Sequence, residues 1–110
     1  MSALDDILEI ALPKIRDLAV EFGNDIVDDV VGDLQQFVRS TADKLQRWNG
    51  LLAEEKLAPE EYAFLVKSQV ALLQMRALMR AGIAQIRIDK FRNKVIEIVI
   101  DTAFDVIIPG

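Results

Sequence analysis

The feature that most constrains this chain is the spacing of its apolar residues, which recur alternately four and three positions apart. A first run consists of Leu4, Leu8, Ala11, Ile15, Leu18 and Phe22. A second run, in a new phase, consists of Val27, Val31, Leu34, Val38, Thr41, Leu45, Trp48 and Leu52. This heptad spacing places the apolar side chains along one line of an α-helix, as in a coiled coil. The pattern predicts helices that pack on one another. Pro13 interrupts the first run without changing its phase, which favours a kink over a helix end.

Local signals indicate where these helices begin and end. Ser2 is a favourable N-cap, and Asp5 stands where the reciprocal residue of a capping box is found. Gly23-Asn24 predicts a break between the first two helices, since both residues accept left-handed backbone conformations. The alternative is one helix with a stutter in its heptads. Pro59, followed by two glutamates, opens a third helix. We therefore expect a single all-α domain over residues 1–110, an elongated hairpin or bundle, with helices over about 3–22, 25–53 and 59–107.

The third predicted helix raises a question of length. A continuous helix of close to fifty residues is about 70 Å long, whereas a compact domain of this size has a radius of gyration of about 13 Å. Either the helix breaks, near Gly82 or between Asp89 and Asn93, or the protein is elongated and other copies cover it. The β-branched run at 95–100 leaves a short C-terminal strand as an alternative. Acidic residues at every fourth position there favour a helix.

On a helical wheel the third helix has two apolar faces, where an ordinary surface helix has one. We expect one face to pack within the chain and the other to bind a second subunit. The alternative is that the two N-terminal helices bury both faces. The residues of the predicted interface are Leu65, Leu72, Met75, Met79, Ile83, Ile86, Ile100 and Phe104. An exposed apolar face of this size is typical of an interaction surface.

Charge is segregated along the chain, whose formal net charge is -5. Residues 1–33 hold nine acids against two bases, and residues 76–94 hold six bases against one acid. We expect the acidic first helix to lie beside the basic part of the third, within or between chains, since such complementarity sets register. The residues predicted to pair by charge are Arg76, Arg80, Arg87, Lys94, Asp101 and Asp105. The two aspartates stand among apolar residues, and we expect each to meet an arginine across a subunit interface.

The composition excludes many kinds of chemistry. The chain has no cysteine and no histidine. Disulfides, zinc fingers, thiol nucleophiles and imidazole bases are therefore excluded. Four aspartates, at positions 25, 28, 29 and 33, lack the spacing of a calcium loop, and we interpret them as a solvated face. No glycine-rich phosphate-binding motif occurs. We therefore expect a protein that is not an enzyme and that binds no metal or cofactor.

The function that these patterns favour is self-association, as a structural or adaptor protein that assembles through the second apolar face. A first alternative is a peripheral membrane protein, because the third helix combines apolar and basic residues. A second is a small inhibitor or regulator that binds another protein through its acidic or apolar surface. We do not expect nucleic-acid binding, since the chain is acidic and has few aromatic side chains for stacking. The amino end lacks the features of a secretory signal and no stretch is apolar enough to span a bilayer, so we expect a cytoplasmic protein.

Overall fold

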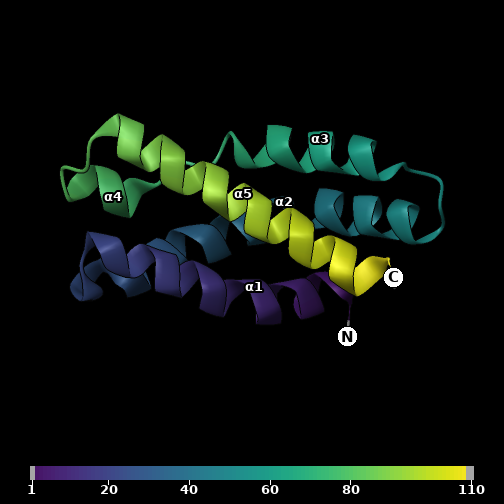
Figure 1. Cartoon of the computed structure of the whole chain (residues 1–110), viewed down its shortest axis with the longest axis horizontal. Helices are drawn as coiled ribbons and strands as arrows, with labels where there is room; N and C mark the ends of the chain where they lie inside the picture. Colours follow the sequence, from purple (N-terminus) through teal and green to yellow (C-terminus); the bar gives the residue numbers. More distant parts are fainter. Residues whose placement is uncertain (1, 109–110) are drawn as a thin grey trace.

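The chain runs four times along the length of one helical bundle, reversing direction after each pass (Figure 1). Helices α1 (Ala3–Ala19) and α2 (Val27–Ala53) form the first two passes. The third pass is divided into α3 (Pro59–Val70) and the short α4 (Arg76–Arg80), and α5 (Gln85–Ile107) forms the fourth. The start of α1 and the end of α5 lie at the same end of the bundle.

The structure is a computed structural model that describes residues 2–108. It contains helices, turns and short links, and no strand within those residues, so the prediction of an all-α bundle is confirmed. The molecule measures 43 × 24 × 23 Å, with a radius of gyration of 13.9 Å. The long dimension is close to the length of α2, whose 27 residues span about 40 Å at 1.5 Å per residue.

The first helix begins and ends as its local sequence predicts. The Ser2 hydroxyl accepts a hydrogen bond from the Asp5 amide at 3.2 Å, and the Asp5 carboxylate accepts one from the Ser2 amide at 3.4 Å, which is the predicted capping box. The helix continues through Pro13, whose side chain is exposed. A 3₁₀ turn (Val20–Phe22) follows, and Gly23 then takes a φ of 115°, so the predicted break is confirmed. A second 3₁₀ turn (Asn24–Ile26) leads into α2.

The C-terminal end of α2 is closed by a left-handed residue. Glu55 has a φ of 60°. Its amide donates to the Leu52 carbonyl, and the Lys56 amide reaches back to the Leu51 carbonyl at 2.9 Å. These two bonds make a Schellman cap, in which the left-handed position is usually glycine. No local signal predicts this cap, because glutamate is unfavourable in a left-handed conformation.

The single helix predicted over 59–107 is instead three helices, and its first break falls in the link Ala71–Met75. This link consists of alanine, leucine, glutamine and methionine, all of which favour helix. Burial explains the break. Leu73 is 3% exposed and Met75 fully buried, while Leu72 and Gln74 are exposed. Two side chains that are two positions apart point the same way in extended chain but in nearly opposite directions on a helix. Only a break in the helix brings both into the core.

The second break falls at Gly82, one of the two places where the sequence allows a break. Gly82 has a φ of 76°. Its amide donates to the Met79 carbonyl at 3.1 Å and the Ile83 amide to the Leu78 carbonyl at 3.1 Å, a Schellman cap on α4. The α5 helix then runs without a break past Asn93 and through the β-branched run at 95–100. The alternatives of a break there and of a C-terminal strand are therefore wrong.

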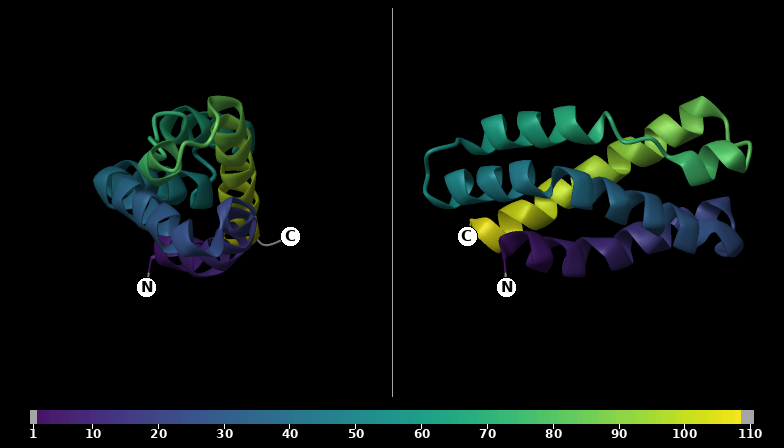
Figure 2. Two further views of the ribbon diagram at one scale, coloured as in Figure 1. Left: turned by 90° about the vertical axis from the view of Figure 1, so that its left-hand side faces the viewer. Right: turned by 180° about the vertical axis from the view of Figure 1, so that it is seen from behind.

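The fourth pass closes the core. The α5 helix crosses the bundle obliquely (Figure 2) and makes its most extensive contact with α1. The ring of Phe22 meets that of Phe91 edge to face, with centroids 5.3 Å apart. The guanidinium carbon of Arg87 lies 5.0 Å from the centroid of the Phe22 ring, a cation–π contact. The first helix and the basic residues 76–94 were predicted to lie side by side, and α1 does pack on α5. At this point, however, Arg87 contacts the aromatic ring of Phe22 and not an acidic side chain.

Candidate interaction surface

The eight residues of the predicted interface divide into exposed and packed groups. Leu72, Met79 and Ile86 are 70%, 57% and 66% exposed. Met75 lies in the core of its own chain, because the link that carries it is not helical. The remaining four are half-buried: Leu65, Ile83, Ile100 and Phe104. The surface that is available to a partner is therefore smaller than the wheel of one continuous helix predicts.

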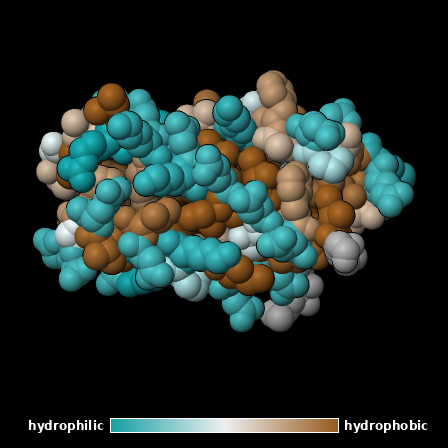
Figure 3. Space-filling model, in the orientation of Figure 1, coloured by the Kyte–Doolittle hydropathy of each residue, from teal (hydrophilic) through white to brown (hydrophobic). Residues whose placement is uncertain are grey.

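The three exposed members lie in three successive elements: the link, α4 and the first turn of α5. They are spaced seven residues apart, but the two helix breaks separate them, so they do not form one straight line. On the face of the bundle shown in Figure 3, apolar surface forms patches between hydrophilic residues. Phe64 on α3 is also 68% exposed. It was not among the predicted interface residues, although it falls on the margin of the same wheel face.

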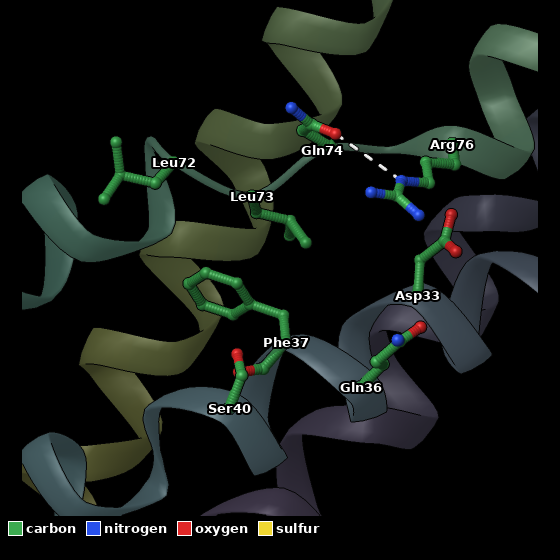
Figure 4. Close-up of a pocket in the computed structure, with 8 residues that line it drawn as sticks. All are labelled: Asp33, Gln36, Phe37, Ser40, Leu72, Leu73, Gln74 and Arg76. Carbon is green, nitrogen blue, oxygen red and sulfur yellow. Dashed lines mark hydrogen bonds between the residues drawn. The ribbon is translucent and has the colours of Figure 1, made fainter.

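A groove lies between α2 and the link, beside Leu72 (Figure 4). Its volume is about 250 Å³. Figure 4 shows Leu73 pointing in toward Phe37 and Leu72 pointing away from it. The polar residues that line the groove are Asp33, Gln36, Ser40, Gln74 and Arg76. The groove therefore combines an apolar part with polar walls on both sides.

Asp33 attaches α4 to α2. Its carboxylate accepts a hydrogen bond from the Ala77 amide at 2.8 Å. The N-terminal residues of a helix have amides without partners within the helix, and Met75, which precedes α4, has no capping side chain. Asp33 therefore caps α4 from another helix. The interpretation of Asp33 as part of a solvated face is wrong, because its carboxylate is partly buried against α4. The sequence does not indicate this contact, since the two residues are 44 positions apart.

None of the six residues predicted to pair by charge forms an ion pair within residues 2–108. Arg76 approaches Gln74 at 3.5 Å, and Arg87 lies over the Phe22 ring. The other four are exposed: Arg80, Lys94, Asp101 and Asp105. The two aspartates face solvent because the oblique α5 turns its other sides to the core. The ion pairs that do form are Arg16–Asp28, Lys56–Glu54 and Arg92–Asp89. The first two are exposed and add little stability, whereas the Arg92 side chain of the third is only 18% exposed.

One buried polar pair joins α2 to α3, and no sequence pattern indicates it. The Tyr62 hydroxyl donates to the Asn49 side-chain oxygen at 2.6 Å. Burial raises the pKa of Tyr62 to about 12. The Asn49 amide nitrogen is buried without a partner. Both side chains are almost fully buried, so the pair packs α2 against α3.

The core also encloses an apolar cavity of about 50 Å³. Side chains from α1, α2, α3 and α5 line it, among them Leu12, Val66 and Val99. It is far below the roughly 300–1,000 Å³ of small-molecule sites. We interpret it as an imperfection of packing.

Among residues 2–108, no set of three or more acidic side chains is arranged to hold a metal ion. No helix in the same range combines the length and apolar character that crossing a bilayer requires. Comparisons of the chain with models of protein families, with curated proteins and with solved structures find no significant similarity.

Proposed function

We propose that this protein is a non-enzymatic structural or adaptor protein that associates with itself through apolar residues of its third and fourth passes. The observation that carries the proposal is the exposure of three large apolar residues of the predicted interface: Leu72, Met79 and Ile86. Full burial of one such side chain contributes about 1.5–3 kcal/mol.

Burial of three side chains from each of two copies contributes on the order of 10 kcal/mol. Association costs about 4–15 kcal/mol in lost freedom of motion. The two quantities are comparable, so we expect an oligomer whose population depends on protein concentration. A light-scattering measurement over a dilution series tests this expectation.

The experiment measures the solution mass of the unmodified chain, whose monomer is 12.4 kDa, and of variants with a charge in the apolar surface. Met79→Glu and Ile86→Glu are each expected to lower the mass, because a carboxylate at the interface must lose its water. The matched control is Asn93→Glu, which adds the same charge at an exposed position of α5. A monomer at micromolar concentration for the unmodified chain would refute the proposal.

Binding to a membrane surface is the second candidate. The observation in its favour is that Arg80 and Arg87 directly follow Met79 and Ile86, and all four are exposed. Apolar and basic side chains together bind anionic bilayers. Flotation with vesicles of anionic lipid separates the candidates, since a protein that only self-associates stays at the bottom of the gradient.

A further inference from the structure

The groove between α2 and the link lies beside an apolar side chain that no part of the described chain covers. Leu72, at the rim, is 70% exposed. The groove has an apolar part formed by Phe37 and Leu73, and a volume of about 250 Å³. This is below the usual size of a small-molecule site, about 300–1,000 Å³. A protruding apolar side chain and a hollow large enough to admit one thus occur on one patch.

The two walls of the groove have opposite character. The α2 wall carries Asp33, with Asp29 one turn away. The other wall carries Arg76, with Arg80 one turn further along α4. Asp29 and both arginines form no ion pair within residues 2–108. A patch with an acidic side and a basic side can pair with a copy of itself.

Two-fold symmetry joins these observations. In a two-fold dimer the same patch is used by both subunits, so that residue i of one meets residue j of the other and the reverse. We propose that the groove is occupied by a second copy of this chain, with Leu72 of each copy in the groove of the other and Arg76 of each facing the other's α2 wall. This inference rests on the proposed self-association and names the face that carries it.

The first test removes the protruding side chain. Leu72→Ala is expected to raise the dimer dissociation constant by about tenfold or more, since burial of a leucine side chain is worth about 1.5–3 kcal/mol. Phe64→Ala is the matched control, because Phe64 has nearly the same exposure, 68%, and lies outside the groove. Equal effects of the two variants would overturn the assignment of this face.

The second test fills the hollow. Ser40 lines the groove on α2, is exposed, and donates its hydroxyl only to the Phe37 carbonyl of its own helix. Ser40→Leu is expected to weaken the dimer while the monomer stays folded, because leucine favours helix more than serine does. Ser68→Leu makes the same change at an exposed position of α3 outside the groove, and it is expected to leave the dimer unchanged.

The third test uses charge. Gln36 lines the α2 wall and is exposed. Arg76→Glu places a glutamate opposite the partner's acidic α2 wall, and Gln36→Arg places an arginine opposite the partner's Arg76, so each variant alone is expected to dimerise less. A mixture of the two is expected to recover a heterodimer, in which Glu and Arg meet across the two-fold axis.

The outcomes separate this inference from the proposed function. A monomeric unmodified chain contradicts both. An oligomer that Met79→Glu or Ile86→Glu weakens, but that Leu72→Ala and Ser40→Leu leave intact, keeps the proposed function and overturns the two-fold groove. An oligomer that every groove variant weakens, with both controls unchanged, supports the two together.

Discussion

The pair of Tyr62 and Asn49 offers the sharpest test of how this bundle is held together. The two side chains are 2% and 4% exposed, and one hydrogen bond of 2.6 Å joins them. Tyr62→Phe removes the hydroxyl but keeps the ring, which packs on Phe104 with centroids 5.9 Å apart. Asn49 then has neither its oxygen nor its nitrogen satisfied. A buried polar group that loses its partner costs about 1–3 kcal/mol, and this is the destabilisation that we expect.

The second variant completes a double-mutant cycle. Asn49→Leu alone leaves the Tyr62 hydroxyl buried without a partner, so we expect a similar loss of about 1–3 kcal/mol. The combination Tyr62→Phe with Asn49→Leu removes every polar atom of the pair. Because the Asn49 nitrogen already lacks a partner, the double variant is expected to be about as stable as the unmodified chain, or more so. The two changes are therefore strongly coupled.

The assay is urea unfolding followed by far-ultraviolet circular dichroism and by the fluorescence of Trp48, the one tryptophan, which packs against the core. A loss of about 1 kcal/mol also lowers the melting temperature of a domain of this size by about 4 °C. A Tyr62→Phe variant as stable as the unmodified chain, or a double variant in which the two losses simply add, would show that the hydrogen bond does not hold the two helices together in this way. All measurements use one protein concentration, since an oligomer adds a concentration-dependent contribution.

Four further predictions concern pH and the backbone. The pKa of a tyrosine in the unfolded chain is about 10, and burial raises the pKa of Tyr62 in the folded chain to about 12. The unfolded chain therefore loses this proton first, and stability falls as the pH rises between these two values. The loss is at most about 2.7 kcal/mol, and an alkaline urea series should show it for the unmodified chain and not for Tyr62→Phe. Gly50, inside α2, has no atom within 4 Å of an added Cβ, so Gly50→Ala should stabilise by about 1 kcal/mol. Gly82→Ala, at a φ of 76°, should destabilise by about 1–2 kcal/mol; thermal melts compare the two, and equal effects would contradict the backbone argument. Glu55→Gly, at a φ of 60°, should stabilise by about 1 kcal/mol, and an unchanged or lower melting temperature would refute this.

The helix ends that the sequence predicts correctly depend on neighbours in the chain. The Ser2–Asp5 capping box involves residues three positions apart. Gly23 and Gly82 each adopt the positive φ that glycine tolerates. The all-α class itself follows from heptad spacing, which a strand cannot satisfy. These features are visible in the sequence because the atoms that produce them are close along the chain.

The candidate surface was predictable only in part. Leu72, Met79 and Ile86 are exposed, as an interface requires. The wheel of one continuous helix also included Met75, which the structure buries. The groove beside Leu72 was not predictable, because its walls come from α2 and from a link more than thirty residues later. The periodic spacing of residues indicates the faces of one helix, and it does not indicate a groove between segments that are distant in the sequence.

The sequence by itself determined that this chain is helical, where α1 starts, that the first two helices are separated at Gly23, and that chemistry based on cysteine or histidine is excluded; it left a break at Gly82 as one alternative among several. Only the tertiary structure decided that Ala71–Met75 is not helical and that α4 is capped by Asp33. The physical reason is one of magnitude. Helix preferences differ by at most about 0.7 kcal/mol among ordinary residues, whereas burial of Leu73 and Met75 is worth about 1.5–3 kcal/mol each. The free energy of burying these two side chains against distant residues therefore exceeds the local preference of the link for a helix.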